Sequence, residues 1–133
     1  TIHDVLGRAE HELLVAAPFL SMDFLTLLDF MASKLSVRIL TSASTLEQSL
    51  LKAIGIEGRL EIRLLEHLHL KSILVDREVA CLTTANFTRK RTAAAREVVT
   101  ILTSRNVIDD MASQFEELWS QAVPLQAHQS FQG

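Results

Sequence analysis

The chain has a single cysteine, no tyrosine and no long apolar run among its 133 residues, and these absences exclude several classes of protein. Cys81 cannot form an internal disulfide or a cysteine-based zinc site by itself, and we interpret it as a buried thiol because it lies in an apolar stretch. No apolar run approaches the roughly 20 residues of a membrane-spanning helix. We therefore expect one small globular domain that is cytoplasmic and has no membrane span.

Positive charge is also scarce, with 13 lysines and arginines against 16 acidic residues and a net charge of −3. The chain as a whole does not attract nucleic acid or acidic membranes, so a local patch must hold any anionic substrate. The densest basic segment follows Asn86, and we interpret it as a set of contacts to backbone phosphates, with a solvated connection as the alternative. Aromatic residues for stacking on bases are missing there, apart from Phe87, which argues against sequence-specific reading. The basic residues are Arg89, Lys90, Arg91 and Arg96.

Hydrophobic periodicity predicts helices interleaved with strands in the first half of the chain and mostly strands in the second half. Ser21 is expected to cap the second helix. The interleaved part favours parallel pairing with helices on both faces of a sheet, whereas tight turns such as Asp76-Arg77 favour antiparallel hairpins. Helices are predicted over 2–13, 22–35, 44–55 and 104–119, and strands over 13–20, 36–42, 59–66, 69–76, 78–85 and 96–104.

These elements predict a single α/β domain over residues 1–124, built on a mixed, mainly β sheet flanked by helices on both faces. Pro124 is expected to mark the end of the domain, with a polar C-terminal tail over 125–133. The chain begins with Thr1, which leaves open that it was excised from a larger multidomain protein.

Four polar side chains can meet where the start of one predicted strand lies beside the end of the next. We call this end of the strand pair the mouth of the sheet. His69 and Lys71 are two residues apart at the start of a predicted strand, so they project to the same side. Thr84 and Asn86 have the same spacing near the end of the next strand. A hairpin that turns near Asp76 brings the two pairs together, because adjacent strands lie about 4.8 Å apart. An imidazole, an ammonium, a hydroxyl and a carboxamide are suited to binding a tetrahedral phosphate.

The spacing of these residues resembles the motif of the phospholipase D superfamily. That motif reads His-x-Lys, four residues, Asp, six residues, Gly-Ser-x-Asn. Glu97, eleven residues after the asparagine, is similar to a glutamate typical of the nuclease-like, single-motif members. The chain departs from the motif at two positions, where Thr83 replaces glycine and Thr84 replaces serine. The matching run is His69-Leu70-Lys71, then residues 72–75, Asp76, residues 77–82 and Thr83-Thr84-Ala85-Asn86.

The resemblance implies a phospholipase D-like fold and a metal-independent phosphodiesterase, foremost an endonuclease acting on DNA or RNA. In the family the histidine, here His69, attacks phosphorus and forms a phosphohistidine. A second copy of that histidine protonates the leaving group, so a chain with one motif is implied to act as a homodimer.

The resemblance also implies roles for the other motif residues. Lys71 and Asn86 would clamp the nonbridging oxygens, and Thr84 would add a hydrogen bond. Glu97 would orient the histidine, and Asp76 would cap the hairpin turn. No cofactor and no metal is implied.

Other functions remain open on the sequence alone. A phospholipase or phosphatidyltransferase would need an apolar entry surface or an anchor, and we find neither. A non-catalytic nucleic-acid-binding or dimerisation module could keep the same fold. His67 and His69 also form a His-x-His pair, a spacing that can bind zinc from one strand face, although no third ligand has convincing spacing.

Overall fold

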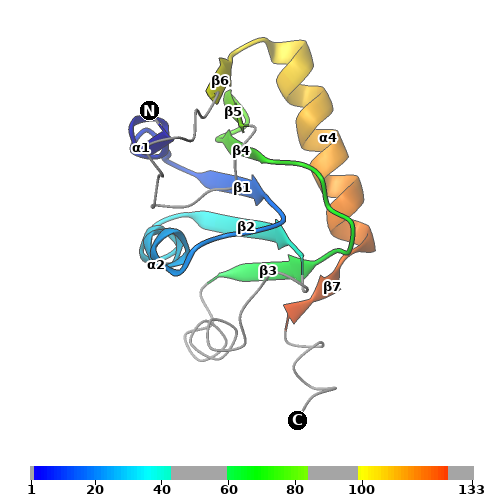
Figure 1. Cartoon of the computed structure of the whole chain (residues 1–133). Helices are drawn as coiled ribbons and strands as arrows, with labels where there is room; N and C mark the ends of the chain where they lie inside the picture. The colour runs from blue at the N-terminus through cyan, green and yellow to red at the C-terminus, as the bar shows by residue number, and fades with distance from the viewer. Residues whose placement is uncertain (1, 43–59, 84–98, 126–133) are drawn as a thin grey trace, which may run out of the picture.

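The computed structural model describes residues 2–42, 60–83 and 99–125. Within these residues, seven strands form one sheet in the order β6-β5-β4-β1-β2-β3-β7. Helices lie on both sides of the sheet (Figure 1), which confirms the predicted fold class. The helices are α1 (Ile2–Leu6), α2 (Met22–Met31) and α4 (Arg105–Gln121); the strands are β1 (Glu12–Ala16), β2 (Ser36–Thr41), β3 (Glu61–Leu64), β4 (Ser72–Val75), β5 (Val79–Thr83), β6 (Val99–Leu102) and β7 (Val123–Pro124).

The mixed pairing follows the prediction from element order. β1, β2 and β3 pair in parallel, while β4, β5 and β6 form an antiparallel meander. β4 joins the two halves because it pairs antiparallel with β1, where Val15 lies opposite Ile73. The central strands are buried on both faces, as parallel strands covered by helices usually are.

Apart from α4, the observed elements are shorter than the predicted ones, and one strand was missed. The first helix ends at Leu6 rather than 13, because the chain from Glu12 onward is drawn into the sheet as β1. The Ser21 cap is confirmed, since its hydroxyl accepts a hydrogen bond from the Phe24 amide at 3.2 Å. The helix predicted over 44–55 lies outside the described residues.

The predicted domain of residues 1–124 stays a prediction. Near its predicted end, Val123 and Pro124 pair with β3 at the sheet edge. A proline is tolerated at such an edge because no further strand needs its missing N–H. Leu125, the first residue of the predicted tail, is 5% exposed and belongs to the core, while 126–133 lie outside the described residues.

Two apolar layers sandwich the sheet. On one face, β-strand side chains such as Val15 and Ile39 pack with α1 and α2. On the other face, Leu14, Leu40 and Leu74 pack with α4. Cys81 is fully buried in the first layer, and its burial raises the pKa of the thiol. This confirms that Cys81 is an interior residue, and a thiol with a raised pKa is a poor nucleophile.

The helix α4 crosses the sheet from edge to edge, from β6 to β7 (Figure 1). Its 17 residues span roughly 25 Å at 1.5 Å per residue, comparable with the width of the sheet. The buried residues recur at intervals of three and four, which is the spacing of one helix face. They are Ile108, Ala112, Phe115 and Trp119.

Four charged side chains tie α4 to the sheet on this face. Arg38 of β2 pairs with Glu116 of α4 at 2.5 Å, and Arg77 pairs with Glu12 of β1 at 2.5 Å. Arg77 also approaches Glu116 at 3.4 Å, and Arg38 approaches Glu12 at 4.0 Å, which closes the ring of alternating charges. The Arg38 guanidinium also lies over the rings of Phe115 and Trp119. We call these four residues, Glu12, Arg38, Arg77 and Glu116, the charge ring.

Candidate active site

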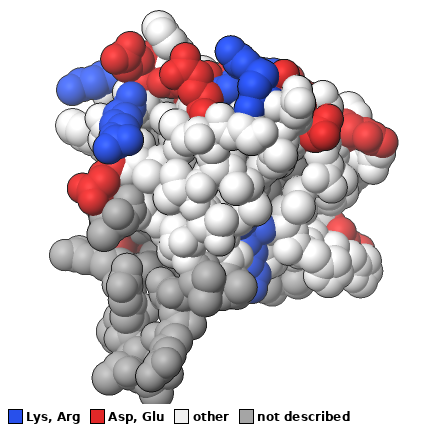
Figure 2. Space-filling view, turned by 90° about the horizontal axis from the view of Figure 1, so that it is seen from above, with Lys and Arg blue, Asp and Glu red and all other residues white. Residues whose placement is uncertain are grey.

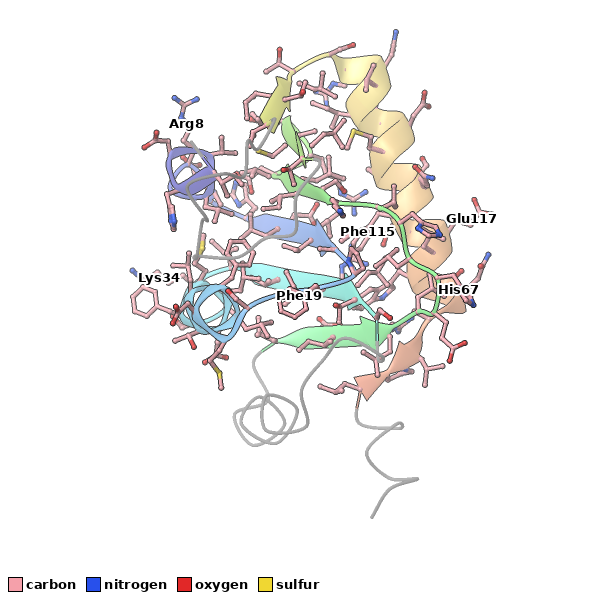
Figure 3. The ribbon with its side chains drawn as sticks, viewed as in Figure 1. Arg8, Phe19, Lys34, His67, Phe115 and Glu117 are labelled. Carbon is pink, nitrogen blue, oxygen red and sulfur yellow. The ribbon has the colours of Figure 1, made fainter. Side chains whose placement is uncertain are left out.

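The segment between β3 and β4 carries the first two motif residues. Leu68 is buried and Leu70 packs against the α4 layer, whereas His67 and His69 are exposed. The alternation in this segment therefore anchors every second side chain in the core and leaves the histidines free to meet solvent or substrate. Figure 1 shows this segment leading into β4 along α4, and Figure 3 places His67 on it, on the same side of the molecule as Glu117.

The strand predicted to begin at His69 begins at Ser72, so His69 and Lys71 precede the regular strand. Pairing nevertheless reaches Lys71, whose carbonyl accepts a hydrogen bond from the Thr83 amide at 3.1 Å. The register from Ser72↔Leu82 to Val75↔Val79 therefore extends by one residue. As predicted, the hairpin brings the start of the 69–76 segment beside the end of β5.

Lys71 is half-buried at this mouth of the hairpin. Residues two apart on a strand share a face, so position 71 continues the row of Val75 and Ile73, which belong to the α1/α2 layer. The apolar row thus ends in a lysine, and His69 precedes it by two residues, outside the regular strand. A half-buried lysine can bury its aliphatic stem while its charged end meets an anion.

Asp76 lies at the opposite end of the hairpin and makes contacts that the sequence did not predict. Its carboxylate accepts backbone hydrogen bonds from Glu10 at 2.9 Å, from His11 at 2.8 Å and from Glu12 at 2.8 Å. Burial alone raises the pKa of this carboxyl, but the three amide donors outweigh it and the pKa is lowered. Asp76 therefore fastens the entry of β1 to the hairpin, a longer-range role than the predicted cap of its own turn.

The turn itself has an uncommon backbone. Asp76 and Arg77 both have φ of 54°, and the Glu78 amide donates to the Val75 carbonyl at 2.9 Å. Two central residues with positive φ are the feature of a type I′ turn, which glycine and asparagine usually supply. Arg77 has no such preference, and its two carboxylate partners hold it in place. They also raise the pKa of its guanidinium, chiefly through the hydrogen bond that the guanidinium donates to Glu12.

The remaining predicted site residues lie outside the described residues. They are Thr84, Asn86 and Glu97 of the motif, and Arg89, Lys90, Arg91 and Arg96 of the basic segment. Their roles stay predictions. Among the residues that the structure does describe, the face seen in Figure 2 carries acidic and basic side chains side by side and no continuous basic surface.

The His-x-His alternative gains no support from the described part of the chain. No group of three histidine, cysteine, aspartate or glutamate side chains is arranged there to hold a metal ion. No helix within the described ranges is long and apolar enough to cross a membrane.

The charge ring is the feature that the sequence interpretation missed. Its ion pairs join residues that are 26 to 78 positions apart in the chain, and the fold brings them together. A charged residue at an alternate position of a buried strand, such as Arg38 in 36–41, is the one signal that could have indicated it. Arg38 sustains the charge of its partner, because its hydrogen bond to Glu116 lowers the pKa of that carboxyl.

A family model and several solved structures are similar to this chain. The family model described as "Cardiolipin synthase, PLD-like domain" matches residues 2–119. No curated protein matches the chain.

Solved structures also match over 92% of this chain. One is Nuc, a phospholipase D family member from Salmonella typhimurium, with a TM-score of 0.73 and 18% identity over 89% of its own chain. NucT from Helicobacter pylori matches with a TM-score of 0.77 and 15% identity, also over 89% of its chain. TrmBL2, described as an archaeal chromatin protein with a novel mode of DNA binding, matches with a TM-score of 0.68 and 22% identity over 48% of its chain. At these identities the likeness shows the fold.

Proposed function

Because the chain belongs to the phospholipase D-like domain family, we propose that it is a metal-independent phosphodiesterase that cleaves nucleic acid in a homodimeric active site. The observation that carries the proposal is the mouth of the β4–β5 hairpin. There an exposed His69 and a half-buried Lys71 precede β4, and the Lys71 carbonyl holds the Thr83 amide at the point where the second half of the motif begins.

The proposed reaction has two displacement steps. In the first, an imidazole nitrogen of His69 attacks phosphorus and the bond from phosphorus to the leaving oxygen breaks, while the partner's His69 gives that oxygen a proton. In the second, the partner's His69 takes a proton from water, the water oxygen attacks phosphorus and the phosphohistidine bond breaks. In-line geometry separates nucleophile from leaving group, so one ring cannot serve both. Two copies related by a twofold axis supply the two rings.

Positive charge for the transition state would come from Lys71 of both subunits, while the carboxamide of Asn86 and the hydroxyl of Thr84 would donate hydrogen bonds. Glu97 would accept from the far nitrogen of His69 and fix its tautomer. Since the ammonium groups neutralise the phosphoryl oxygens, the reaction needs no metal ion. The basic residues Arg89, Lys90, Arg91 and Arg96 would hold neighbouring phosphates of the polymer.

The test is an assay on a generic aryl phosphodiester and on DNA in the presence of EDTA. We expect hydrolysis of both, a loss of at least about 10³-fold in His69→Ala and no change in its melting temperature, because His69 is exposed. Glu117→Gln, at another exposed position, is the matched control. Acid-labile phosphate trapped on the wild-type protein but not on His69→Ala would identify the intermediate. Full activity in His69→Ala would overturn the assignment.

Two observations keep other functions in competition. The likeness to TrmBL2 favours a non-catalytic DNA-binding module, which would bind DNA and cleave nothing between pH 5 and 8. The name of the matching family model favours a lipid phosphatidyltransferase, which would release a headgroup from phospholipid vesicles. The same assay with vesicles as a third substrate separates the three functions.

A further inference from the structure

Three side chains form the last row of the sheet before its mouth. Lys71 lies opposite Thr83 through the hydrogen bond between their backbones, and Thr83 lies opposite Val99 in the β5–β6 ladder. Directly opposite residues of antiparallel strands share a face. The row inward of this one, Ile73 and Cys81, is buried at 1% and 0% exposure, and Val99 packs against the same layer.

Thr83 is therefore the middle residue of a row that separates the apolar core from the catalytic mouth. Its two neighbours in the row differ in chemistry. Lys71 carries the ammonium that is proposed to bind phosphate, and Val99 is apolar. Adjacent strands are about 4.8 Å apart, so positions 71 and 99 lie roughly 10 Å apart, and within the described sheet position 83 lies between them. A glycine there would have no side chain on this face, whereas threonine places a branched side chain between Lys71 and Val99.

We propose that Thr83 determines substrate specificity, and that it makes this site select single-stranded nucleic acid over duplex. The inference rests on the proposed function, because it assumes that a phosphate binds beside Lys71. A single strand can rotate its backbone bonds and pass around one side chain. A duplex resists local bending, with a persistence length of about 50 nm, and we expect the branched side chain at position 83 to hold it away from Lys71.

The expected change in the preference between single strand and duplex follows from the steric effect of one or two buried carbon atoms. Steric contacts on this scale change relative rates by about 10- to 200-fold. We expect the wild type to favour a single-stranded oligonucleotide over the same sequence as a duplex, and Thr83→Gly to lower that ratio at least about 10-fold. Thr83→Val keeps the shape and removes the hydroxyl, so it should keep the ratio. Thr83→Ser removes one methyl group and should lie between.

The experiment measures kcat/KM of the homodimer on three substrates: an aryl phosphodiester, a single-stranded oligonucleotide and its duplex. The aryl ester is small enough to pass Thr83, so its hydrolysis should change little in Thr83→Gly. A wild-type ratio near one, an unchanged ratio in Thr83→Gly or a ratio lost in Thr83→Val would each overturn the inference. Thr83→Gly also removes a strand side chain, so its melting temperature is measured alongside, and Thr83→Ser gives the same comparison with less loss of strand propensity.

A binding measurement separates this inference from the proposed function. Dissociation constants for the two oligonucleotides are compared in His69→Gln and in the double variant that adds Thr83→Gly. If the wild type cleaves nothing while the binding preference still shifts with Thr83→Gly, the catalytic proposal fails and the steric one stands. If the wild type cleaves both oligonucleotides while the preference does not respond to position 83, only the steric inference fails.

Discussion

The two ends of the β4–β5 hairpin differ in the kind of contact found there. At the turn, Asp76 accepts hydrogen bonds from three backbone amides and Arg77 belongs to a ring of alternating charges that includes α4. At the mouth, His69 is exposed, Lys71 is half-buried, and the Lys71 carbonyl accepts a hydrogen bond from the Thr83 amide. Asp76 and His69 belong to one motif, but they thus lie at opposite ends of the hairpin and have different surroundings.

Contacts at the turn can position the residues that are proposed to act at the mouth. A slip of one residue in a β ladder turns every side chain to the opposite face, which would turn Lys71 away from the mouth. The contacts at the turn favour one register of the hairpin, and this register decides which side chains lie at the mouth. Residues that are proposed to bind substrate can then reach the surface, because the distant end of the same hairpin holds the register.

The largest effect on stability should come from removing the Asp76 carboxylate. Asp76→Ala loses three hydrogen bonds to a charged acceptor and places alanine at a φ of 54°, so we expect the free energy of unfolding to fall by about 3 kcal/mol. Asp76→Asn tolerates the same backbone and keeps one acceptor oxygen, so it should lose less. Urea denaturation measures both. Equal stability in Asp76→Ala and the wild type would contradict the proposed role of the turn.

A smaller effect should follow from neutralising the charge ring. Glu116→Gln leaves the shape of the side chain but removes the charge that faces Arg38 and Arg77. Because the Glu116 side chain is 41% exposed, solvent screens the pairs, and we expect a loss of about 1 kcal/mol. Glu117→Gln, one position along α4 and outside the ring, should change stability by less than about 0.5 kcal/mol. Equal losses in the two variants would show that the ring has no special weight.

The smallest effect should appear in the acid dependence of stability. The pKa of Asp76 and that of Glu116 are lowered in the folded protein, so their stabilisation is present above the unfolded values, near 4. It is lost as the pH falls through the lower folded values. Asp76→Asn should therefore lose less stability than the wild type between about pH 5 and pH 2. Parallel curves of unfolding free energy against pH would contradict this.

Sequence patterning was sufficient for the fold because the strands bury apolar side chains in the sheet and the helices show periodic apolar faces. It also predicted the hairpin that brings Lys71 beside the end of β5, since a tight turn at Asp76 leaves one way to pair the two strands. The roles of His69 and Lys71 stay predictions. It failed at the edges, where Val123 and Pro124 form a strand that no pattern of two residues could indicate. It did not predict the hydrogen bonds of Asp76 either. Their donors are backbone amides 64 to 66 positions away, and no local sequence pattern indicates such contacts.

The central claim is that two copies of His69 act on one phosphorus, and subunit mixing tests it most directly. Wild-type chains and His69→Ala chains are unfolded together, refolded in equal amounts and assayed on the aryl phosphodiester at constant total protein. If one site needs both histidines, only dimers of two wild-type chains are active, and activity should fall to about a quarter. Mixing with Glu117→Gln should leave it unchanged. Activity of about half, the value for chains that act independently, would contradict the claim.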